Sequence, residues 1–228
     1  MESPSFSPDL FSFLEELADH NDRAWFKANR QRYDDAVQEP ALAFIAAFAP
    51  HLRRISRHFG ADARPVGGSL FRIQRDTRFS KDKTPYKTNV GISFRHQQTG
   101  DVHAPGFYLH MEPGSVFAAA GVWHPDSATL GRIRDTIAAC PDEWTQVAHG
   151  RPFVAAYRLD GASLVRPPRG YDPDHPVIAD LKRKDFIGVV ALTEKKALSP
   201  GFIDEYAQVC RAAAPFMRFL CDAIGVPF

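Results

Sequence analysis

The sequence predicts an α+β fold, a single domain with helices packed on one face of a largely antiparallel or mixed sheet of about five or six strands. Apolar residues recur at helical spacing in the amino-terminal and carboxy-terminal regions, so helices are expected at both ends. Between them the apolar period changes to the alternation that is typical of strands. No linker-like composition and no internal repeat divides residues 1–228, which favours one domain.

The amino-terminal region is predicted to form three helices. Each start carries a capping residue or a proline, and these starts are Ser7-Pro8, Asn21 or Asp22, and Pro40. The third helix is expected to end at Gly60, because glycine is common directly after a helix. Pro50 lies inside its apolar pattern and predicts a kink or a break, since proline cannot donate the helical hydrogen bond.

The middle of the chain is predicted to hold four strands. They are SLFRIQ (69–74), NVGISF (89–94), GFYLHM (106–111) and SVFAAAGVW (115–123). The last two form the simplest hairpin, with the turn at residues 112–115. Pro-Gly in that turn favours type II geometry, so a bulge that shifts the register by one residue is an alternative.

The carboxy-terminal half alternates helices with two further strand candidates. The buried strand is FIGVVAL (186–192), and ASLVR (162–166) is a possible second one. Predicted helices begin at Asp126 or Ser127, at Pro141, and at Ser199-Pro200. Pro215 predicts a kink in the last helix.

The overall charge excludes a broad attraction for polyanions. The formal charge is +1 and the sequence pI is about 7.8, so no field draws the whole molecule onto nucleic acid or an acidic membrane. Its three cysteines have no C-x-x-C spacing, which favours reduced thiols. No apolar run reaches the length of a membrane span, and the amino terminus has no signal-like pattern. A soluble, cytoplasmic protein is predicted.

Positive charge is concentrated between residues 72 and 87. Two acids, Asp76 and Asp82, lie among six cations there, so the local charge is +4. The cations are Arg72, Arg75, Arg78, Lys81, Lys83 and Lys87. Thr84-Pro85 disfavours a helix, so the segment is expected to be a loop between two strands. Arginine can bind phosphate or carboxylate with two parallel hydrogen bonds, while lysine supplies a point charge. With the Ser80 hydroxyl, these cations are predicted to bind an anionic ligand. In the alternative, the two acids pair with some cations and water solvates the rest.

Strand alternation separates a core face from a polar face of the predicted sheet. The core face is expected to carry Phe71, Ile73, Val90, Ile92, Phe94, Phe107, Leu109 and Met111. The polar face is expected to carry Arg72, Gln74, Ser93, Arg95, Tyr108, His110 and Glu112, and a two-residue turn would add Phe117 and Trp123. Such a face is either a solvated surface or the floor of a site. Tyr108 and Trp123 are therefore predicted to contact the ligand beside the cationic loop.

His110 and Glu112 are the candidate catalytic residues. They stand two positions apart on one strand face, which suits a hydrogen-bonded acid–base pair. The chain contains neither H-x-x-x-H nor H-E-x-x-H, so no metal site is predicted.

Four segments together resemble one protein family. They are LADHNDRAWFKANRQRYDDAV, RIQRDTRFSKDKTPYKTNVGISF, PGFYLHMEPGSVFAAAGVWHP and RPPRGYDPDHPVIADLKRKDF. The chain resembles the bacterial and fungal hypothetical proteins grouped as domain-of-unknown-function family 2461, over nearly its whole length. The resemblance implies a complete single-domain unit and transfers no activity and no catalytic residue to this chain.

The leading hypothesis is a protein that binds a phosphorylated or otherwise anionic small molecule at the cationic loop, with or without turnover. One alternative is a nucleic-acid-binding module, in which the loop and a second basic cluster at residues 166–184 contact phosphates across a groove. Phe79, Tyr86 and Trp123 would then stack on bases. The other alternative is an interaction scaffold whose loop docks an acidic protein. No membrane partner is predicted, and the sequence leaves the cofactor and the oligomeric state open.

Overall fold

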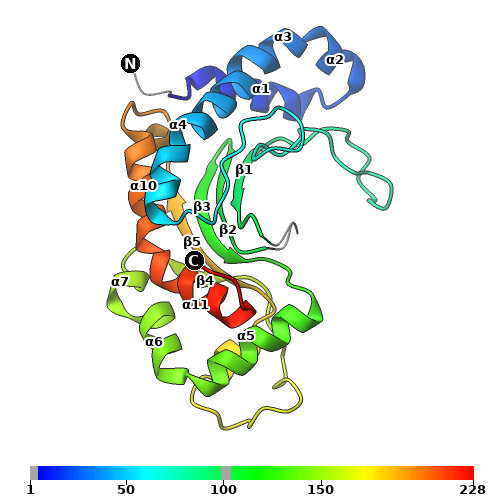
Figure 1. Ribbon diagram of the computed structural model, residues 1–228. Helices are drawn as coiled ribbons and strands as arrows, with labels where there is room; N and C mark the ends of the chain where they lie inside the picture. Colours follow the sequence, from blue (N-terminus) through cyan, green and yellow to red (C-terminus); the bar gives the residue numbers. More distant parts are fainter. Residues whose placement is uncertain (1–4, 99–103) are drawn as a thin grey trace.

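The protein forms one antiparallel sheet with helices on one side. The computed structural model describes residues 5–98 and 104–228. Its strands are β1 (Val90–Arg95), β2 (Gly106–Glu112), β3 (Ser115–Val122), β4 (Arg158–Asp160) and β5 (Phe186–Leu192). They lie in the order β1-β2-β3-β5-β4, and every neighbouring pair is antiparallel. The helices α4 (Glu39–Ile55), α10 (Phe202–Ala212) and α11 (Ala214–Ile224) cover one face (Figure 1), which confirms the predicted α+β class.

The amino-terminal helices begin largely where their caps predict. The first is α1 (Pro8–Asp19), and α2 (Arg23–Ala28) is capped by Asp22, whose carboxylate accepts the N–H of Ala24 and Trp25 at 2.8 and 2.9 Å. Two further elements follow, α3 (Arg30–Tyr33) and the π-helical turn η1 (Asp34–Gln38), and they run into α4 without interruption.

Helix α4 begins at Glu39, one residue before the predicted start at Pro40, but the predicted break at Pro50 and the predicted end at Gly60 are wrong. The chain is helical continuously from Arg30 to Ile55. The π turn shifts the hydrogen-bond register just before Pro40, so the helix passes through a residue that has no N–H to donate. Pro50 is exposed, and so is Ala46, whose carbonyl it leaves without a helical partner. Water can therefore reach this carbonyl, and the helix ends only at Ser56.

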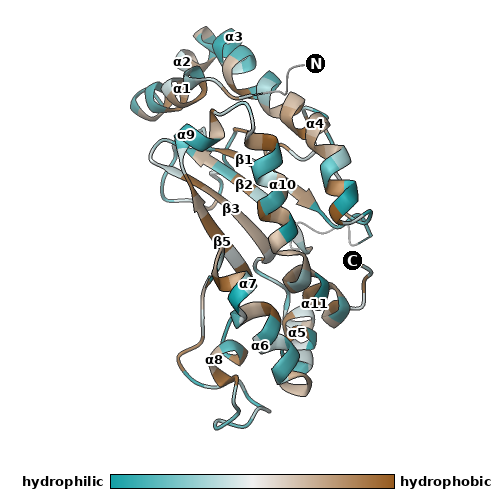
Figure 2. Cartoon of the chain, turned by 90° about the vertical axis from the view of Figure 1, so that its left-hand side faces the viewer, coloured by the Kyte–Doolittle hydropathy of each residue, from teal (hydrophilic) through white to brown (hydrophobic). Residues whose placement is uncertain are grey.

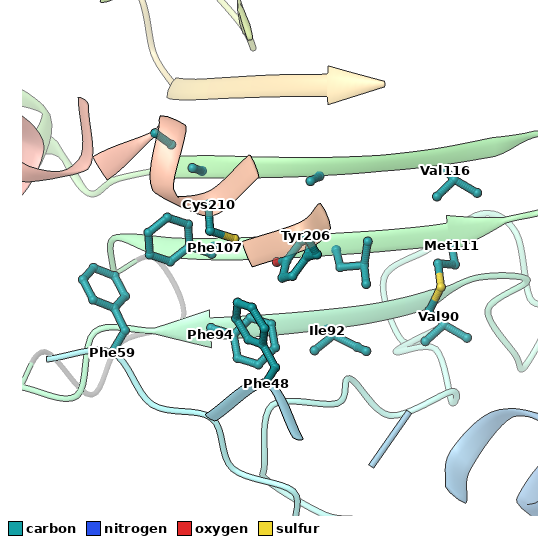
Figure 3. Packing of buried hydrophobic residues seen from close by; sticks show 14 of the residues in the cluster. Phe48, Phe59, Val90, Ile92, Phe94, Phe107, Met111, Val116, Tyr206 and Cys210 are labelled. Atoms are coloured by element: carbon teal, nitrogen blue, oxygen red, sulfur yellow. The ribbon is translucent and has the colours of Figure 1, made fainter. Parts of the chain in front are cut away.

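The core lies between the sheet and its helices. Alternation placed the inward residues of β1 and β2 correctly, because Ile92 pairs with Leu109 and Phe94 with Phe107, and all four are buried. Helix side chains such as Phe48 cover them (Figure 3), and its ring centroid lies 4.8 Å from that of Phe94. Figure 2 views the molecule from this side and shows α10 lying across the largely hydrophobic strands.

The β2–β3 hairpin has the regular two-residue turn and not the bulged alternative. Glu112 pairs with Ser115, and the register continues without a shift to the pair of Gly106 and Gly121. Gly114 takes φ +75° in this turn, a left-handed conformation that glycine adopts without strain. The unshifted register fixes which β3 side chains share a face with His110.

Two predicted strands do not form. Residues 69–74 run beside β1 but make only the isolated bridges Leu70–Ile92 and Gln74–Tyr86. Leu70 and Ile73 are buried, three positions apart, whereas the Phe71 side chain is 37% exposed and lies on the polar face. The prediction that Phe71 faces the core is therefore wrong. Residues 162–166 are also irregular, and the short strand β4 precedes them.

The carboxy-terminal half adds helices at both ends of the sheet. Four of them lie toward the end at which β3 finishes (Figure 2), and they are α5 (Ser127–Ala139), α6 (Pro141–His149), α7 (Arg151–Val154) and α8 (Ile178–Leu181). Helix α9 (Glu194–Ala197) lies at the other end, where Glu194 Oε1 accepts the Gly114 N–H of the β2–β3 turn at 2.7 Å. Helices α10 and α11 follow. Asp126 caps α5, and the predicted interruption near Pro215 is confirmed, because α10 and α11 are separated at Ala213. No helix in the described ranges has the length and apolar content required to cross a membrane.

A buried carboxylate ties α6 to α8. Asp180 accepts hydrogen bonds from Trp144 Nε1 at 2.9 Å, His149 Nε2 at 2.7 Å and Arg183 Nε at 3.0 Å. Burial acts to raise the pKa of Asp180, but the hydrogen bonds from these three side chains outweigh it and lower that pKa below its ordinary value.

Candidate functional site

Residues 72–88, here called the basic finger, project from the edge of the sheet beside β1 (Figure 1). As predicted, the segment is not helical. Its base is a short paired region, in which Arg75 N–H donates to the carbonyl of Pro85 at 2.9 Å and Lys87 N–H donates to that of Ile73 at 2.8 Å. The finger therefore has an ordered base joined to the sheet edge.

Asn21 and Phe26 clamp the base of the finger to the first helices. The Asn21 amide accepts the N–H of Tyr86 and donates to its carbonyl, both at 3.0 Å. The Tyr86 ring stacks on that of Phe26, with centroids 4.1 Å apart. Tyr86 is buried by these contacts and is not available to stack on a base, which contradicts part of the nucleic-acid alternative.

Most cations of the basic finger already have partners within it. The Arg75 guanidinium donates to Asp82 and Thr84, and Arg78 forms an ion pair with Asp76 at 2.6 Å. The hydrogen bonds from Arg75 and Arg78 lower the pKa of Asp82 and that of Asp76 to about 2. From the sequence, internal pairing of Asp76 and Asp82 with these cations is the alternative to ligand binding, and both ion pairs form.

The lysines of the finger divide into two groups. Lys83 Nζ donates to the Thr77 carbonyl at 2.8 Å, and Lys87 Nζ donates to the Arg72 carbonyl at 3.0 Å. Lys81 is exposed near the tip, and Ser80 beside it is half-buried. Within the described residues, no hydrogen bond or ion pair holds the Arg72 guanidinium or the Lys81 ammonium.

The Arg72 side chain contributes to a cavity of about 390 Å³ at the foot of the finger. The cavity lies between α3, η1, residues 65–74 and the end of β1, and its charged lining residues are Arg30, Arg72 and Arg95. Among the residues that the structure describes, no aspartate or glutamate lines it, and of the three arginines Arg30 has a carboxylate partner, Asp34, at 2.9 Å. These guanidinium groups give the cavity lining a positive charge.

The other lining residues provide flat apolar surface and amide groups. Tyr33 and Phe71 are the aromatic rings of the lining, and Gln38 and Gln74 are the amides. The alternation of side chains along β1 places Arg95 on the polar face of the sheet, as the sequence predicts. Nothing local in the sequence indicates Arg30 or Tyr33, because the cavity arises where a helix from the amino terminus packs against the finger.

The predicted acid–base pair is brought together on the open face of the sheet. His110 Nε2 lies 3.2 Å from Glu112 Oε2, and Thr88 Oγ1 donates to the other Glu112 oxygen at 2.9 Å. On the other side of the ring, Tyr108 Oη lies 3.1 Å from His110 Nδ1. The imidazole stacks on Phe117, with centroids 4.5 Å apart. We call Tyr108, His110 and Glu112 the β2 relay.

Glu112 selects one arrangement of protons along the β2 relay. Burial, followed by the charge of Glu112, raises the pKa of Tyr108 to about 12, so its hydroxyl is protonated at neutral pH. A carboxylate only accepts hydrogen bonds, so a neutral imidazole carries its proton on Nε2 and directs it at Glu112. In that tautomer His110 Nδ1 is the acceptor for the Tyr108 hydroxyl.

Phe71 lies between the cavity and the β2 relay. Its ring lines the cavity, and its centroid is 5.9 Å from that of Tyr108. Two cations flank the same ring, with Lys87 Nζ at 5.4 Å and the Arg95 guanidinium carbon at 5.6 Å from its centroid. Burial, together with the charge of Arg72, lowers the pKa of Lys87.

Trp123 is not part of this arrangement. It follows the end of β3 and is 57% exposed, with its ring against His124. Ala119, four positions earlier, is the residue opposite Tyr108, which places Trp123 about 13 Å further along the strand. The second basic cluster at residues 166–184 is also remote, because Figure 1 places it at the opposite end of the molecule from the finger.

No three His, Cys, Asp or Glu side chains gather as potential metal ligands in the part of the chain that the structure describes. A search of curated proteins gave no match. The family model for the conserved hypothetical proteins DUF2461 matches residues 9–219, which is most of the chain and includes the finger, the cavity and the β2 relay. The chain therefore belongs to the DUF2461 family of conserved hypothetical proteins.

Proposed function

We propose that the protein binds a phosphorylated or otherwise anionic small molecule in the cavity at the foot of the basic finger. The observation that carries the proposal is the lining, in which three arginines border about 390 Å³ and no carboxylate belongs to a described residue. That volume is within the range of about 300–1,000 Å³ found for small-molecule sites. Guanidinium groups bind phosphate and carboxylate with paired hydrogen bonds, so the lining suits either group.

The pairing of charges favours the cavity over the tip of the finger. An anion at Arg75 or Arg78 would have to displace Asp82 or Asp76, which already supply the negative charge. An anion at Arg72 and Arg95 displaces no carboxylate, because no ion pair holds either guanidinium within the described residues. The aromatic ring of Phe71, a residue that is 37% exposed, adds apolar surface against which a flat organic group can pack.

A ligand screen tests the proposal. Nucleotides, sugar phosphates, polyphosphates and small carboxylates would be compared by thermal-shift measurement and then by calorimetry. We expect at least one to raise the melting temperature of the wild-type protein, since a ligand that binds only the folded state stabilises it. Arg72→Glu should abolish the shift and Arg78→Glu should retain it. A panel without a hit, or a hit that responds to Arg78 and not to Arg72, would refute the cavity as the site.

Phe79 favours a second candidate function, in which the finger docks a partner protein with an acidic surface. The side chain is 95% exposed at the finger tip, and the Arg78 guanidinium carbon lies 5.8 Å from its ring centroid. Exposed aromatic residues on ordered loops are frequent anchors of protein interfaces. A partner that is released by Phe79→Ala and by Lys81→Glu, but not by Arg72→Glu, would support this function over ligand binding.

A further inference from the structure

The β2 relay has a geometry that anion binding alone does not require. Three side chains at alternate positions of one strand form a continuous chain of hydrogen-bonding distances, 3.1 Å from Tyr108 to His110 and 3.2 Å from His110 to Glu112. They alternate with the buried residues Phe107, Leu109 and Met111 along β2, so they lie on the other face of the sheet. Figure 1 shows α4, α10 and α11 together on one side of the sheet. None of the three is fully buried, and the side chains of His110 and Glu112 are 14% and 38% exposed.

Gly91 is what allows Tyr108 to reach His110. Gly91 is the strand partner of His110, and the phenol ring extends across it. A Cβ atom at this position would lie 2.7 Å from Tyr108 Oη and 3.0 Å from Phe71 Cδ2, well inside van der Waals contact. Glycine at this position of β1 therefore leaves the space that the Tyr108 hydroxyl occupies.

We propose that the β2 relay is a proton-transfer site, with Tyr108 Oη as the atom that exchanges a proton with an anionic small molecule carrying an acidic C–H or O–H group. The inference rests on the proposed function, because the cavity supplies the charged anchor for that substrate. Phe71 and Arg95 connect the two places, since both line the cavity and Phe71 contacts Tyr108. A substrate anchored by Arg95 has its reacting group directed past Phe71 toward the phenol.

The chemical step moves two protons and breaks no other bond. The substrate gives its proton to Tyr108 Oη as the phenol proton passes to His110 Nδ1, and the substrate keeps the electron pair of the broken bond as an anion. Glu112, which accepts from Nε2, stabilises the imidazolium that results. Lys87 and Arg95, the cations beside Phe71, favour the negative charge that develops on the substrate. The reverse transfer restores the relay.

Nitrogen-15 NMR of the imidazole tests the relay in the free protein. With His110 assigned by loss of its signals in His110→Gln, we expect the Nε2–H tautomer at about pH 8.5, where imidazoles are neutral. Tyr108→Phe should shift the Nδ1 resonance, because it removes the closer of the two groups at that nitrogen, the other being Asn89 Nδ2 at 3.5 Å. Gly91→Ala should produce the same shift. An Nδ1–H tautomer, or a resonance that neither variant moves, would overturn the inference even where ligands bind.

Turnover in D₂O tests the chemistry with the compounds that the screen identifies as ligands. Proton NMR should show exchange of a substrate C–H for deuterium, or conversion to product, for at least one bound compound. Tyr108→Phe should lower kcat by about 100-fold or more with KM changed less than about threefold, because general acid–base groups contribute roughly that factor. Lys195→Ala, an exposed substitution on α9, is the control and should match the wild type.

The two proposals fail in distinguishable ways. A compound that binds through Arg72, yet is neither exchanged nor converted, refutes the relay and leaves the proposed function standing. A panel without any ligand refutes the proposed function, and the relay, which depends on it, fails as a catalytic site. Equal kcat in the wild type and Tyr108→Phe likewise overturns the role of Tyr108.

Discussion

Replacing Asn21 by alanine tests whether the basic finger is held in place by the helices beneath it. The Asn21 amide makes two hydrogen bonds of 3.0 Å to the backbone of Tyr86. The neighbouring pairing bonds of the finger use Arg75 N–H and Lys87 N–H and so leave the Tyr86 N–H and carbonyl to Asn21. Each bond contributes about 1 kcal/mol net, and leaving partly buried backbone groups unpaired costs more, so the loss should total about 2–3 kcal/mol.

The assay is urea unfolding followed by tryptophan fluorescence, with thermal unfolding as a second measure. For a chain of this size, a loss of about 2–3 kcal/mol in the free energy of unfolding lowers the melting temperature by roughly 5–10 °C. The control is Gln31→Ala, which removes an exposed contact to Asp35 and should change the free energy by less than about 0.5 kcal/mol. A loss in Asn21→Ala no larger than in the control would refute the clamp.

Three further predictions concern other parts of the fold. Because the folded pKa of Asp180 lies below its unfolded value, its stabilisation is present above about pH 4 and is lost as the pH falls through the folded pKa. Asp180→Asn should therefore flatten the acid limb of a stability–pH curve and cost about 3 kcal/mol at neutral pH. In a thiol titration of the folded protein, only the exposed Cys140 should react quickly, because burial raises the pKa of thiols such as Cys221, here to about 12. Gly91→Ala should cost about 1–3 kcal/mol in the free energy of unfolding, since its Cβ overlaps Tyr108; a cost near zero would contradict the close contact.

Local patterns predicted the sheet face correctly where the pairing is regular. Tyr108, His110 and Glu112 share a face because β2 pairs on both sides without a bulge, so strict alternation holds. Phe71 was misplaced because its segment pairs first with β1 and then with the far side of the finger. The change of partner rotates the chain between Leu70 and Ile73, and no residue type in the sequence marks that rotation.

The cavity could not be predicted from the sequence, although its components are visible there. The sequence shows the positive charge of the finger, and it also shows that Asp76 and Asp82 lie close enough along the chain to pair with cations of the finger. Arg30 and Arg72 line the same cavity because α3 packs beside the finger, where Asn21 also bonds to Tyr86, 65 positions away. Contacts of that sequence separation leave no periodic signal, so local patterns in the sequence do not indicate this cavity.

The affinity of the best ligand for Arg72→Glu, measured by calorimetry beside Arg78→Glu, tests the central claim most directly. Both substitutions reverse one arginine of the finger and change the net charge equally, but only Arg72 lines the cavity. We predict that Arg72→Glu weakens binding by at least about 30-fold, equivalent to about 2 kcal/mol, and that Arg78→Glu changes it by less than about threefold. Equal losses, or a larger loss in Arg78→Glu, would contradict the account and place the ligand on the finger itself.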